Sequence, residues 1–364
     1  MPTFTIVAGA RPNFMKIAPI IHVFQSQQKA GLVVHYRLVH TGQHYDRKMS
    51  GDFFDQLNIP EPHANLGGGG GTQAEQTAAI MIAFEKELLE NRPDLVIVVG
   101  DVTSTLACSI AAKKLQIDVA HVEGGIRSGD LSMPEEINRM VTDSITDHFF
   151  TTSEIANYNL RKAGFSEDKI HFVGNTMIDT LLAQMPFFKK PEGQTFENLQ
   201  TGNYFVMTMH RPANVDQEQS LKAMIDAILE GTGGLPIFFP VHPRTAKNLQ
   251  NLGIEDPNLH LCEPLGYLEF NYLVKNAKGV ITDSGGVTEE ASVMNVPCLT
   301  LRDNTERPET VNLGTNVLVG TDPKKLKPYL DKIMKGDWKK YQGIPLWDGK
   351  TAKRIVDILV KSYS

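Results

Sequence analysis

One short segment combines residue types that can hold a phosphate group and a sugar diol. The segment Thr282–Ala291 reads TDSGGVTEEA and follows a short apolar, strand-like run. Its turn, formed by Ser284, Gly285 and Gly286, stands before a predicted helix, so backbone N–H groups and the positive helix end would face an incoming anion. Glu290, one helical turn later, can accept hydrogen bonds from two sugar hydroxyls. The segment therefore indicates a nucleotide site, with an ordinary Gly-Gly turn as the alternative.

Polar or glycine-rich turns follow the predicted strands in both halves of the chain. In an open parallel α/β sheet the ligand binds outside the carboxyl ends of the strands, so we expect these turns to meet in one cleft. Each turn alone has an ordinary explanation: Asp101 can cap the following helix, and His210 or His242 can be a structural histidine. Their repetition favours a functional site. The turns are residues 9–11, 41–44, 100–101, 123–125, 210–212, 242–244 and 283–286.

Charge divides the candidate residues into two roles. Arg11 and Lys16 supply positive charge that suits a pyrophosphate. The second group consists of acids and bases, namely Asp101, Glu123, His210 and the neighbouring carboxylates of Glu135 and Glu136. Because carboxylates in a partly desolvated cleft cannot all ionise, the pKa of at least one is expected to rise towards the range useful for proton transfer. At least one of the two neighbouring glutamates is expected to be only a solvated helix start. The set suits chemistry at a weakly acidic C–H bond.

The composition limits the classes of partner. The chain has 364 residues and a net charge of −6, which argues against a nucleic acid or an anionic membrane surface as the main partner. No apolar run approaches membrane-spanning length, and the N-terminus runs directly into a strand-like segment, so no signal peptide is expected. The three cysteines lie far apart, and neither a His-Glu-x-x-His motif nor a calcium loop is present. We therefore expect no metal and a cytoplasmic location.

Short β-branched runs alternate with longer amphipathic stretches throughout the chain. This alternation predicts α/β architecture, with two Rossmann-like doubly wound domains that face each other across a cleft. The predicted strands are residues 4–8, 33–40, 95–99, 119–122, 149–151, 170–173, 204–209, 237–241, 259–261, 279–282 and 297–301. The predicted helices of the first half are residues 14–27, 74–89, 105–115, 135–145 and 155–163.

The domain boundaries follow a change in composition. Residues 186–203 are rich in Pro, Lys, Gly and Gln and lack periodicity, so they are predicted to form a linker. The linker separates an N-terminal Rossmann-like domain, residues 1–185, which carries most of the acid/base residues, from a C-terminal nucleotide-binding domain, residues 204–345. The last helix, within residues 346–364, is expected to pack back on the N-terminal domain.

Taken together, the motifs resemble those of the non-hydrolysing UDP-N-acetylglucosamine 2-epimerases, in the order of that family and over nearly the whole chain. The matching segments of the first half are ARP at 10–12 with Lys16, HTGQH at 40–44, GD at 100–101, HVEGGIRSG at 121–129, PEEINR at 134–139 and GNT at 174–176. Those of the second half are HR at 210–211, HP at 242–243, TDSGGVTEEA at 282–291 and RDNTERPE at 302–309. The resemblance implies the GT-B fold of nucleotide-sugar glycosyltransferases and a homodimer.

The resemblance also implies a reaction, the reversible inversion at carbon 2 of UDP-N-acetylglucosamine. A base removes the carbon-2 proton as UDP leaves, 2-acetamidoglucal stays bound, and UDP adds back after reprotonation on the opposite face. The implied proton-handling residues are Asp101, Glu123, Glu135 and His210. The implied substrate-binding residues are Arg11, Lys16, Ser284, Gly285, Gly286, Glu290 on the ribose hydroxyls, Arg307, and Phe270 near the uracil. No NAD and no metal are implied, because the overall oxidation state does not change.

The chain departs from the pattern of this family in three places. Leu265 stands where many bacterial members have a glutamine, so only a main-chain contact to the uracil would be kept there. Residues 45–46, Tyr-Asp, replace the usual arginine near the place where several bacterial members bind a second UDP-N-acetylglucosamine as activator, so such regulation is not expected here. The segment 129–134 is shorter than in some members, which would reshape the surroundings of Glu135.

Three functions fit these observations. The first is epimerisation of UDP-N-acetylglucosamine. The second is the same chemistry on a modified sugar, such as a UDP-2,3-diacetamido glucuronate for surface polysaccharide. The third is a hydrolysing UDP-sugar 2-epimerase or a glycosyltransferase on the same fold. Residues 129–139, with their Pro-Glu-Glu and Asn-Arg, are more similar to the non-hydrolysing group, which argues against a hydrolysing enzyme.

Overall fold

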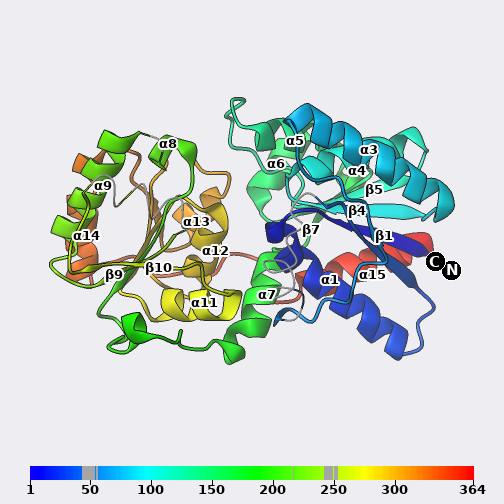
Figure 1. Cartoon of the computed structure of the whole chain (residues 1–364). Helices are drawn as coiled ribbons and strands as arrows, with labels where there is room; N and C mark the ends of the chain where they lie inside the picture. The colour runs from blue at the N-terminus through cyan, green and yellow to red at the C-terminus, as the bar shows by residue number, and fades with distance from the viewer. Residues whose placement is uncertain (43–53, 55, 216, 242–248, 250–252) are drawn as a thin grey trace. The chain divides into compact units, whose positions relative to one another are not determined.

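The chain folds into two compact units, each built on one parallel sheet. In the computed structural model, unit 1 consists of Met1–Ala183 and Pro345–Ser364, and unit 2 consists of Gln184–Ile344. Figure 1 shows helices packed on each sheet, with unit 1 coloured from blue to green and ending in a red helix. The structure describes all residues except 43–53, 55, 216, 242–248 and 250–252. The predicted fold class of two parallel α/β domains is confirmed.

The sheet of unit 1 has the strand order β3-β2-β1-β4-β5-β6-β7, with parallel pairing throughout. The order reverses between β1 and β4, because the chain first runs outwards to β2 and β3 and then returns. At such a reversal the connections leave in opposite directions, so the carboxyl ends of the two central strands are open to a ligand. The strands are β1 (Thr3–Ala8), β2 (His35–His40), β3 (Ala64–Asn65), β4 (Leu95–Val99), β5 (Asp118–Val122), β6 (His148–Thr151) and β7 (Ile170–Phe172).

The sheet of unit 2 repeats this arrangement. Its strand order is β10-β9-β8-β11-β12-β13, again parallel, and it reverses between β8 and β11. The predicted strands are present with ends moved by one or two residues, whereas β3 and β13 were not predicted because they are too short to show a pattern. The strands are β8 (Phe205–Thr208), β9 (Ile237–Pro240), β10 (Leu259–Cys262), β11 (Gly279–Thr282), β12 (Cys298–Thr300) and β13 (Asn316–Leu318).

Helices connect the strands of both sheets. The start of α3 illustrates how the sequence sets a boundary: the Thr72 hydroxyl accepts a hydrogen bond from the Glu75 N–H at 3.2 Å, and the Glu75 carboxylate accepts one from the Thr72 N–H at 2.8 Å. The helices of unit 1 are α1 (Arg11–Lys29), α3 (Gln73–Glu90), α4 (Thr103–Lys114), α5 (Pro134–Ser144), α6 (Glu154–Lys162), α7 (Thr176–Gln184), which ends at the unit boundary, and α15 (Thr351–Tyr363). Those of unit 2 are α8 (Pro212–Val215), α9 (Glu218–Gly231), α11 (Tyr267–Asn276), α12 (Gly285–Val293), α13 (Pro308–Asn312) and α14 (Lys327–Met334).

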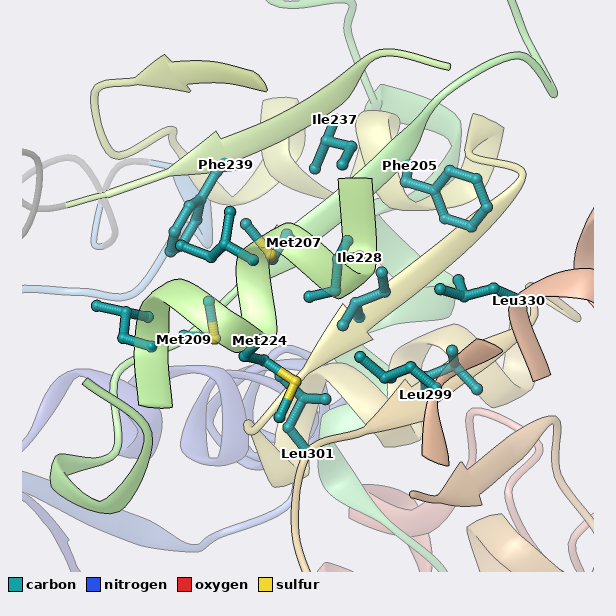
Figure 2. Packing of buried hydrophobic residues seen from close by; sticks show 14 of the residues in the cluster. Phe205, Met207, Met209, Met224, Ile228, Ile237, Phe239, Leu299, Leu301 and Leu330 are labelled. Carbon is teal, nitrogen blue, oxygen red and sulfur yellow. The ribbon is translucent and has the colours of Figure 1, made fainter. Parts of the chain in front are cut away.

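Both faces of the central strand β8 are buried. Phe205, Met207 and, just past the strand, Met209 point to one face, where they meet side chains of α9 and of β12 (Figure 2). Val206 points to the opposite face, into a second apolar cluster with residues of α11 and α12. Side chains alternate between the faces of a strand, so a strand that is covered on both sides must be apolar at successive positions. This burial holds the end of β8 rigidly beside the end of β11.

The predicted linker, residues 186–203, instead packs into unit 2. Phe196 is buried, and its ring lies 5.4 Å from that of Phe238 on β9. The N–H of Gly202 donates to the carbonyl of Asn276 at 2.8 Å. Its Pro- and Gly-rich composition suggested a free connection, but one buried aromatic side chain is enough to fix the segment on the sheet.

The C-terminal segment returns to unit 1 and is held there at several points. The indole N–H of Trp347 donates to the carbonyl of Thr152 at 3.0 Å. The carboxylate of Asp179 accepts hydrogen bonds from the N–H groups of Thr351, at 3.1 Å, and Ala352, at 2.7 Å, at the start of α15. Near the other end of α15, the Tyr363 hydroxyl donates to Asp118 at 2.6 Å. Unit 1 therefore depends on residues that follow unit 2 in the sequence.

Gly174 provides a test of this dependence. Its φ is +102°, and a Cβ atom there would lie 2.1 Å from the carbonyl oxygen of Leu346. We expect Gly174→Ala to lower the free energy of unfolding by several kcal/mol, because it adds a steric clash to an unfavourable backbone conformation. Gly164→Ala is the matched control, since Gly164 also has a positive φ (+91°) but no atom within 4 Å of the added carbon. The control should lose roughly 1–2 kcal/mol in chemical denaturation. Equal losses in the two variants would show that the returning segment does not dock here.

Candidate active-site residues in the two units

The loop after β1 is fixed against β4 at the strand reversal of unit 1. The Asn13 side chain accepts hydrogen bonds from the N–H groups of Gly9 and Ala10, both at 3.0 Å, and donates to the carbonyl of Val99 at 3.3 Å. A Cβ atom on Gly9 would lie only 1.9 Å from the hydroxyl oxygen of Ser104, so the close approach requires glycine. Arg11 is the first residue of α1, and its side chain lies outside the described part of the structure.

Lys16 and Glu123 form a buried ion pair at the same edge of the sheet. The Lys16 Nζ lies 2.8 Å from the Glu123 Oε2, and the two side chains are 11% and 3% exposed. Gly100 makes room for this pair, because a Cβ atom there would lie 2.8 Å from the Lys16 Nζ. Glu123 itself has a φ of +74°, which is unfavourable for a residue with a side chain. Their opposite charges predicted different roles for these two residues, and in the structure the two side chains are in contact.

Asp101 is held by a chain of charged groups from α5. Its carboxylate lies 2.5 Å from the Arg139 guanidinium, whose other amino group lies 2.6 Å from Glu136. Glu136 also accepts hydrogen bonds from the N–H groups of Ser128 and Gly129, both at 3.0 Å. Burial alone would raise the pKa of Glu136, but these hydrogen bonds and the Arg139 charge lower it below its usual range. Asp101 keeps a side chain that is 28% exposed, so it remains accessible to a ligand.

Glu135 and Glu136, adjacent in sequence, have opposite environments. Glu136 is buried in the contacts just described, whereas Glu135 is exposed in the first turn of α5. Successive helical residues point about 100° apart, so one of the two had to turn away from the core. The sequence predicted that at least one of them would be solvated; in the structure Glu135 is exposed, and its carboxylate is therefore accessible to a ligand.

His121 is a fully buried histidine of β5 that bonds through both ring nitrogens. Its Nδ1 lies 2.7 Å from the Asp143 carboxylate and its Nε2 lies 2.8 Å from the carbonyl oxygen of Gly100. Asp143 also pairs with Arg127 at 2.6 Å. Burial would raise the pKa of Asp143, but His121 and Arg127 lower it below its usual range. This cluster fixes the turn before Asp101, and its histidine has no nitrogen left for a substrate.

His210 and Asp283 meet at the strand reversal of unit 2. His210 follows β8, Asp283 follows β11, and the His210 Nδ1 lies 2.7 Å from an Asp283 carboxylate oxygen. Asp283 is completely buried, whereas the His210 side chain is 64% exposed. Asp283 also accepts hydrogen bonds from the Arg211 N–H and the Asn214 side chain, both at 2.9 Å. Despite burial, these donors and His210 lower the pKa of Asp283 to about 2.

The predicted anion-binding turn forms the start of α12. Ser284 stands at the N-terminal cap and Gly285 begins the helix, so the first N–H groups of the helix lie at the carboxyl edge of the sheet. Glu306 lies close to this turn, since a Cβ atom on Gly285 would be 3.0 Å from its Oε1. Arg302 holds Glu306 through a contact of 2.6 Å. Gly286 lies in the first turn of the same helix.

Three further predicted substrate-binding residues lie on or near the helices around this turn. The Glu290 carboxyl is buried and accepts a hydrogen bond from the Tyr267 hydroxyl at 2.7 Å; burial raises its pKa to about 7, despite that bond. Arg307 lies 2.6 Å from Glu289 and both are buried. Phe270 is partly buried on α11, against an apolar cluster. Glu290 is thus a candidate carboxyl with the raised pKa that the sequence analysis expected, but it lies in unit 2.

Some predicted features lie outside the described residues, namely 43–46 and 242–244. Within the described ranges, no group of three or more His, Cys, Asp and Glu side chains is arranged to hold a metal ion. Among the helices that the structure describes, none is both long enough and apolar enough to cross a membrane.

The sequence analysis did not single out several polar residues at these strand ends. The Asn13 side chain binds the Val99 carbonyl, and the Asn214 side chain binds Asp283 and the Leu301 carbonyl. These partners are far away in the sequence, and no motif marks such asparagines. Asp143 is not marked by a motif either, although its position one helical turn after Arg139 could have suggested that both lie on the buried face of α5. Asp283 stood inside the quoted motif, but nothing in the sequence alone links it to His210.

Comparison with known proteins gives the relatives of this chain. Residues 27–360 match the family model described as UDP-N-acetylglucosamine 2-epimerase. The UDP-N-acetylglucosamine 2-epimerase of Methanocaldococcus jannaschii is 43% identical, over 98% of each chain. The UDP-2,3-diacetamido-2,3-dideoxy-D-glucuronate 2-epimerase of Pseudomonas aeruginosa is 36% identical, over 99% of this chain and 100% of its own. The crystal structure of the Methanocaldococcus jannaschii enzyme in complex with UDP-GlcNAc and UDP matches 99% of each chain, with 43% identity and a TM-score of 0.87.

The raised pKa of Glu290 predicts a pH dependence of stability. Its folded-state pKa of about 7 lies above the ordinary value of 4.5, so the folded state binds this proton more tightly than the unfolded state does. The free energy of unfolding therefore falls as pH rises between these two values. We expect this loss to be on the order of 3 kcal/mol and to disappear in Glu290→Gln, measured as the difference in denaturant midpoint between pH 5 and pH 8. Tyr267→Phe removes a hydrogen bond that lowers this pKa, so the pKa of Glu290 should rise further in this variant. The free energy of unfolding of the variant should then continue to fall up to a higher pH than in the wild type. A wild-type slope in Glu290→Gln would refute the assignment.

Proposed function

This chain belongs to the UDP-N-acetylglucosamine 2-epimerase family and is an isomerase, and we propose that it interconverts UDP-N-acetylglucosamine and UDP-N-acetylmannosamine. The observation that carries the proposal is the accessible Asp101 carboxylate, held by Arg139 at the strand reversal of unit 1. A carboxylate can accept a proton from carbon 2, and a fixed one does so at a defined angle. The proposed reaction has two steps, elimination of UDP and its re-addition.

In the elimination step the base takes the carbon-2 proton, and the electrons of that C–H bond form a carbon 1–carbon 2 double bond. The bond between carbon 1 and the UDP oxygen breaks, and UDP leaves with the electron pair. The product is 2-acetamidoglucal. Re-addition reverses these changes, with the proton delivered to the opposite face of carbon 2. The reaction therefore needs proton-handling groups for two faces, and Asp101, Glu123, Glu135 and His210 are the proposed set.

Unit 2 is proposed to hold the UDP portion. The N-terminal turn of α12, with Ser284, Gly285 and Gly286, suits the diphosphate, since its N–H groups stabilise the negative charge that grows as UDP leaves. Glu290 is proposed to bind the ribose hydroxyls and Phe270 to lie near the uracil. Arg11, Lys16 and Arg307 are proposed to add positive charge. For Lys16 and Arg307 this requires sharing the charge with Glu123 and Glu289, their partners in the structure.

A second candidate substrate is a UDP-2,3-diacetamido sugar acid. It is supported by the relative from Pseudomonas aeruginosa, which is named for that substrate and is 36% identical over the full chain. The relative from Methanocaldococcus jannaschii, at 43%, favours UDP-N-acetylglucosamine. The two substrates differ at carbons 3 and 6, so the same proton transfer at carbon 2 would serve both.

The proposed compartment is the cytoplasm. Cys108, Cys262 and Cys298 are free thiols, two of them fully buried. Such thiols are stable where the environment is reducing. The proposed partners are thus a UDP-sugar and a second copy of the chain.

The reaction itself can be tested by incubation with UDP-N-acetylglucosamine in deuterium oxide. We expect UDP-N-acetylmannosamine, with deuterium at carbon 2 of both epimers, because the proton taken by the enzyme exchanges with solvent before it returns. NMR and mass spectrometry of the sugar nucleotides measure this. Release of free N-acetylmannosamine would contradict the proposal in favour of hydrolysis. Absence of turnover, with turnover of the UDP-2,3-diacetamido sugar acid, would establish the second candidate.

Asp101→Asn tests the proposed base. The substitution keeps the shape of the side chain but removes its basicity, so deuterium incorporation should fall by about 10²–10⁴-fold with little change in UDP affinity. Asp94→Asn is the matched control: Asp94 precedes β4 as Asp101 follows it, and its carboxylate accepts a hydrogen bond from the Thr3 N–H at 2.8 Å. The control should keep full activity. Collapse of UDP binding in Asp101→Asn would show that Asp101 holds the nucleotide instead.

A homodimer is proposed from an exposed apolar face of α5. Ile137, Met140 and Val141 are 48%, 46% and 37% exposed and lie three or four residues apart, on one side of the helix. Tyr158 of α6, 60% exposed, adds an aromatic side chain in the same unit. Contiguous apolar side chains on a surface favour association. The opposite side of α5 carries Arg139 and Glu136, so association would also fix the helix that holds Asp101.

Two substitutions on this face should separate the subunits. We expect Ile137→Glu with Met140→Glu to convert a dimer into a monomer in light scattering after size exclusion, because two like charges would be buried without partners. Phe187→Glu is the control, since Phe187 is also an exposed apolar residue, at 65%, but belongs to unit 2. A wild type that is monomeric, or a double variant that stays dimeric, would refute the proposed interface.

A further inference from the structure

We propose that Asp283 is a positioning residue that fixes the ring tautomer of His210 and ties it to the diphosphate-binding turn. The inference rests on the proposed function for the role of His210. It concerns a buried acid that the sequence motif suggests is part of the nucleotide site, but that the structure separates from any ligand by complete burial.

The hydrogen bonds of Asp283 divide between its two oxygens. The Oδ2 accepts from the N–H groups of His210, at 3.0 Å, and Arg211, at 2.9 Å, and from the Asn214 side chain, at 2.9 Å. The Oδ1 faces the His210 Nδ1 at 2.7 Å and has a longer contact, of 3.2 Å, with the N–H of the same residue. A carboxylate surrounded by donors remains ionised, and so it can only accept hydrogen bonds.

This arrangement determines which nitrogen of His210 carries the proton. Because the Asp283 oxygen is an acceptor, the Nδ1 that faces it must carry a hydrogen. In the neutral ring the other nitrogen, Nε2, is then a bare acceptor. The His210 side chain is 64% exposed, so this nitrogen is available to take or return a proton. The tautomer that a proton-handling histidine needs is thus built into the fold.

The buried His121 of unit 1 provides a contrast within the same chain. Its Nδ1 lies against the Asp143 carboxylate and its Nε2 against the Gly100 carbonyl, so both ring nitrogens are engaged within the fold. Neither nitrogen is open to a substrate. The chain therefore uses one Asp–His pair to build a turn and another, open on one side, to prepare a reactive nitrogen.

Asp283 also lies next to the residues that would hold the diphosphate. Ser284, the cap of α12, follows it directly, and the Ser284 N–H donates to the Thr282 hydroxyl at 3.0 Å. That hydroxyl in turn lies 2.6 Å from the Thr208 hydroxyl on β8. These contacts and those of the Asp283 carboxylate thus join the end of β8, which precedes His210, to the turn that begins α12.

Asp283→Asn replaces one of the two acceptor oxygens of the carboxylate with an NH₂ donor. The three donors at Oδ2 require the amide oxygen there, which places the amide NH₂ against the His210 Nδ1. That nitrogen must then become the acceptor, and the proton moves to Nε2. In ¹⁵N-labelled protein, we expect the ring of His210, assigned from its absence in His210→Gln, to change from the Nδ1–H to the Nε2–H form.

The kinetic result should separate positioning from binding. We expect kcat of Asp283→Asn to fall by about 10²-fold or more while the Kd for UDP changes less than about threefold, because the diphosphate turn is retained. Asn214→Ala is the matched control: it removes a donor from the same carboxylate but leaves the ring contact, so stability should fall and the tautomer should not change. In the His210→Gln background, Asp283→Asn should reduce kcat no further.

The outcomes distinguish this inference from the proposed function. A wild-type ring with its proton on Nε2 overturns the inference even if the variant does not fold. An unchanged tautomer in Asp283→Asn, or an additional loss of kcat in the double variant, also overturns it. A tautomer change as expected, with full epimerase activity in His210→Gln, supports Asp283 as the positioning residue and removes His210 from the proposed proton-handling set.

Discussion

The reversal of strand order in each sheet is the constraint on which the rest of this structure depends. Between β1 and β4, and between β8 and β11, the connections leave in opposite directions, and the carboxyl ends of the strands are uncovered. Only there can polar groups stand at the edge of a buried sheet without a helix above them. The candidate residues Asp101 and His210 follow strands at these two reversals, which explains why residues from distant parts of the sequence form one local arrangement in each unit.

The buried acids at these edges support neighbours that are more exposed. Glu136, bound to backbone N–H groups, holds Arg139, and Arg139 holds Asp101. Asp283, bound in the same way, holds His210. A buried carboxylate is stable only when donors surround it, and this requirement makes it a rigid support. In unit 2 the candidate residue His210 contacts the buried acid directly, whereas in unit 1 Asp101 is joined to the buried acid through Arg139.

The fold was predictable because strands buried on both faces, such as Leu95–Val99, appear as uninterrupted apolar runs. The sequence predicted that the candidate residues follow the ends of strands, but it did not predict which of these residues contact one another. Lys16 meets Glu123 only because Gly100 leaves room between two strands, which no local pattern reveals. Glu135 and Glu136 could not be told apart, because the direction of α5 decides which of them is buried. The packing of residues 186–203 in unit 2 could not be predicted, since composition does not show where Phe196 packs.

The return of the chain to unit 1 has a consequence for its synthesis. Unit 2 is one continuous segment, so all of its residues are synthesised before Pro345–Ser364. Unit 1, although it is begun first, still lacks α15 and the backbone donors that bind Asp179. N-terminal domains generally fold first during synthesis, but unit 1 can be completed only after unit 2 has been synthesised. Until α15 is made, the side of α1 that it covers stays open, and a chain that ended before Pro345 would contain all of unit 2 but only part of unit 1.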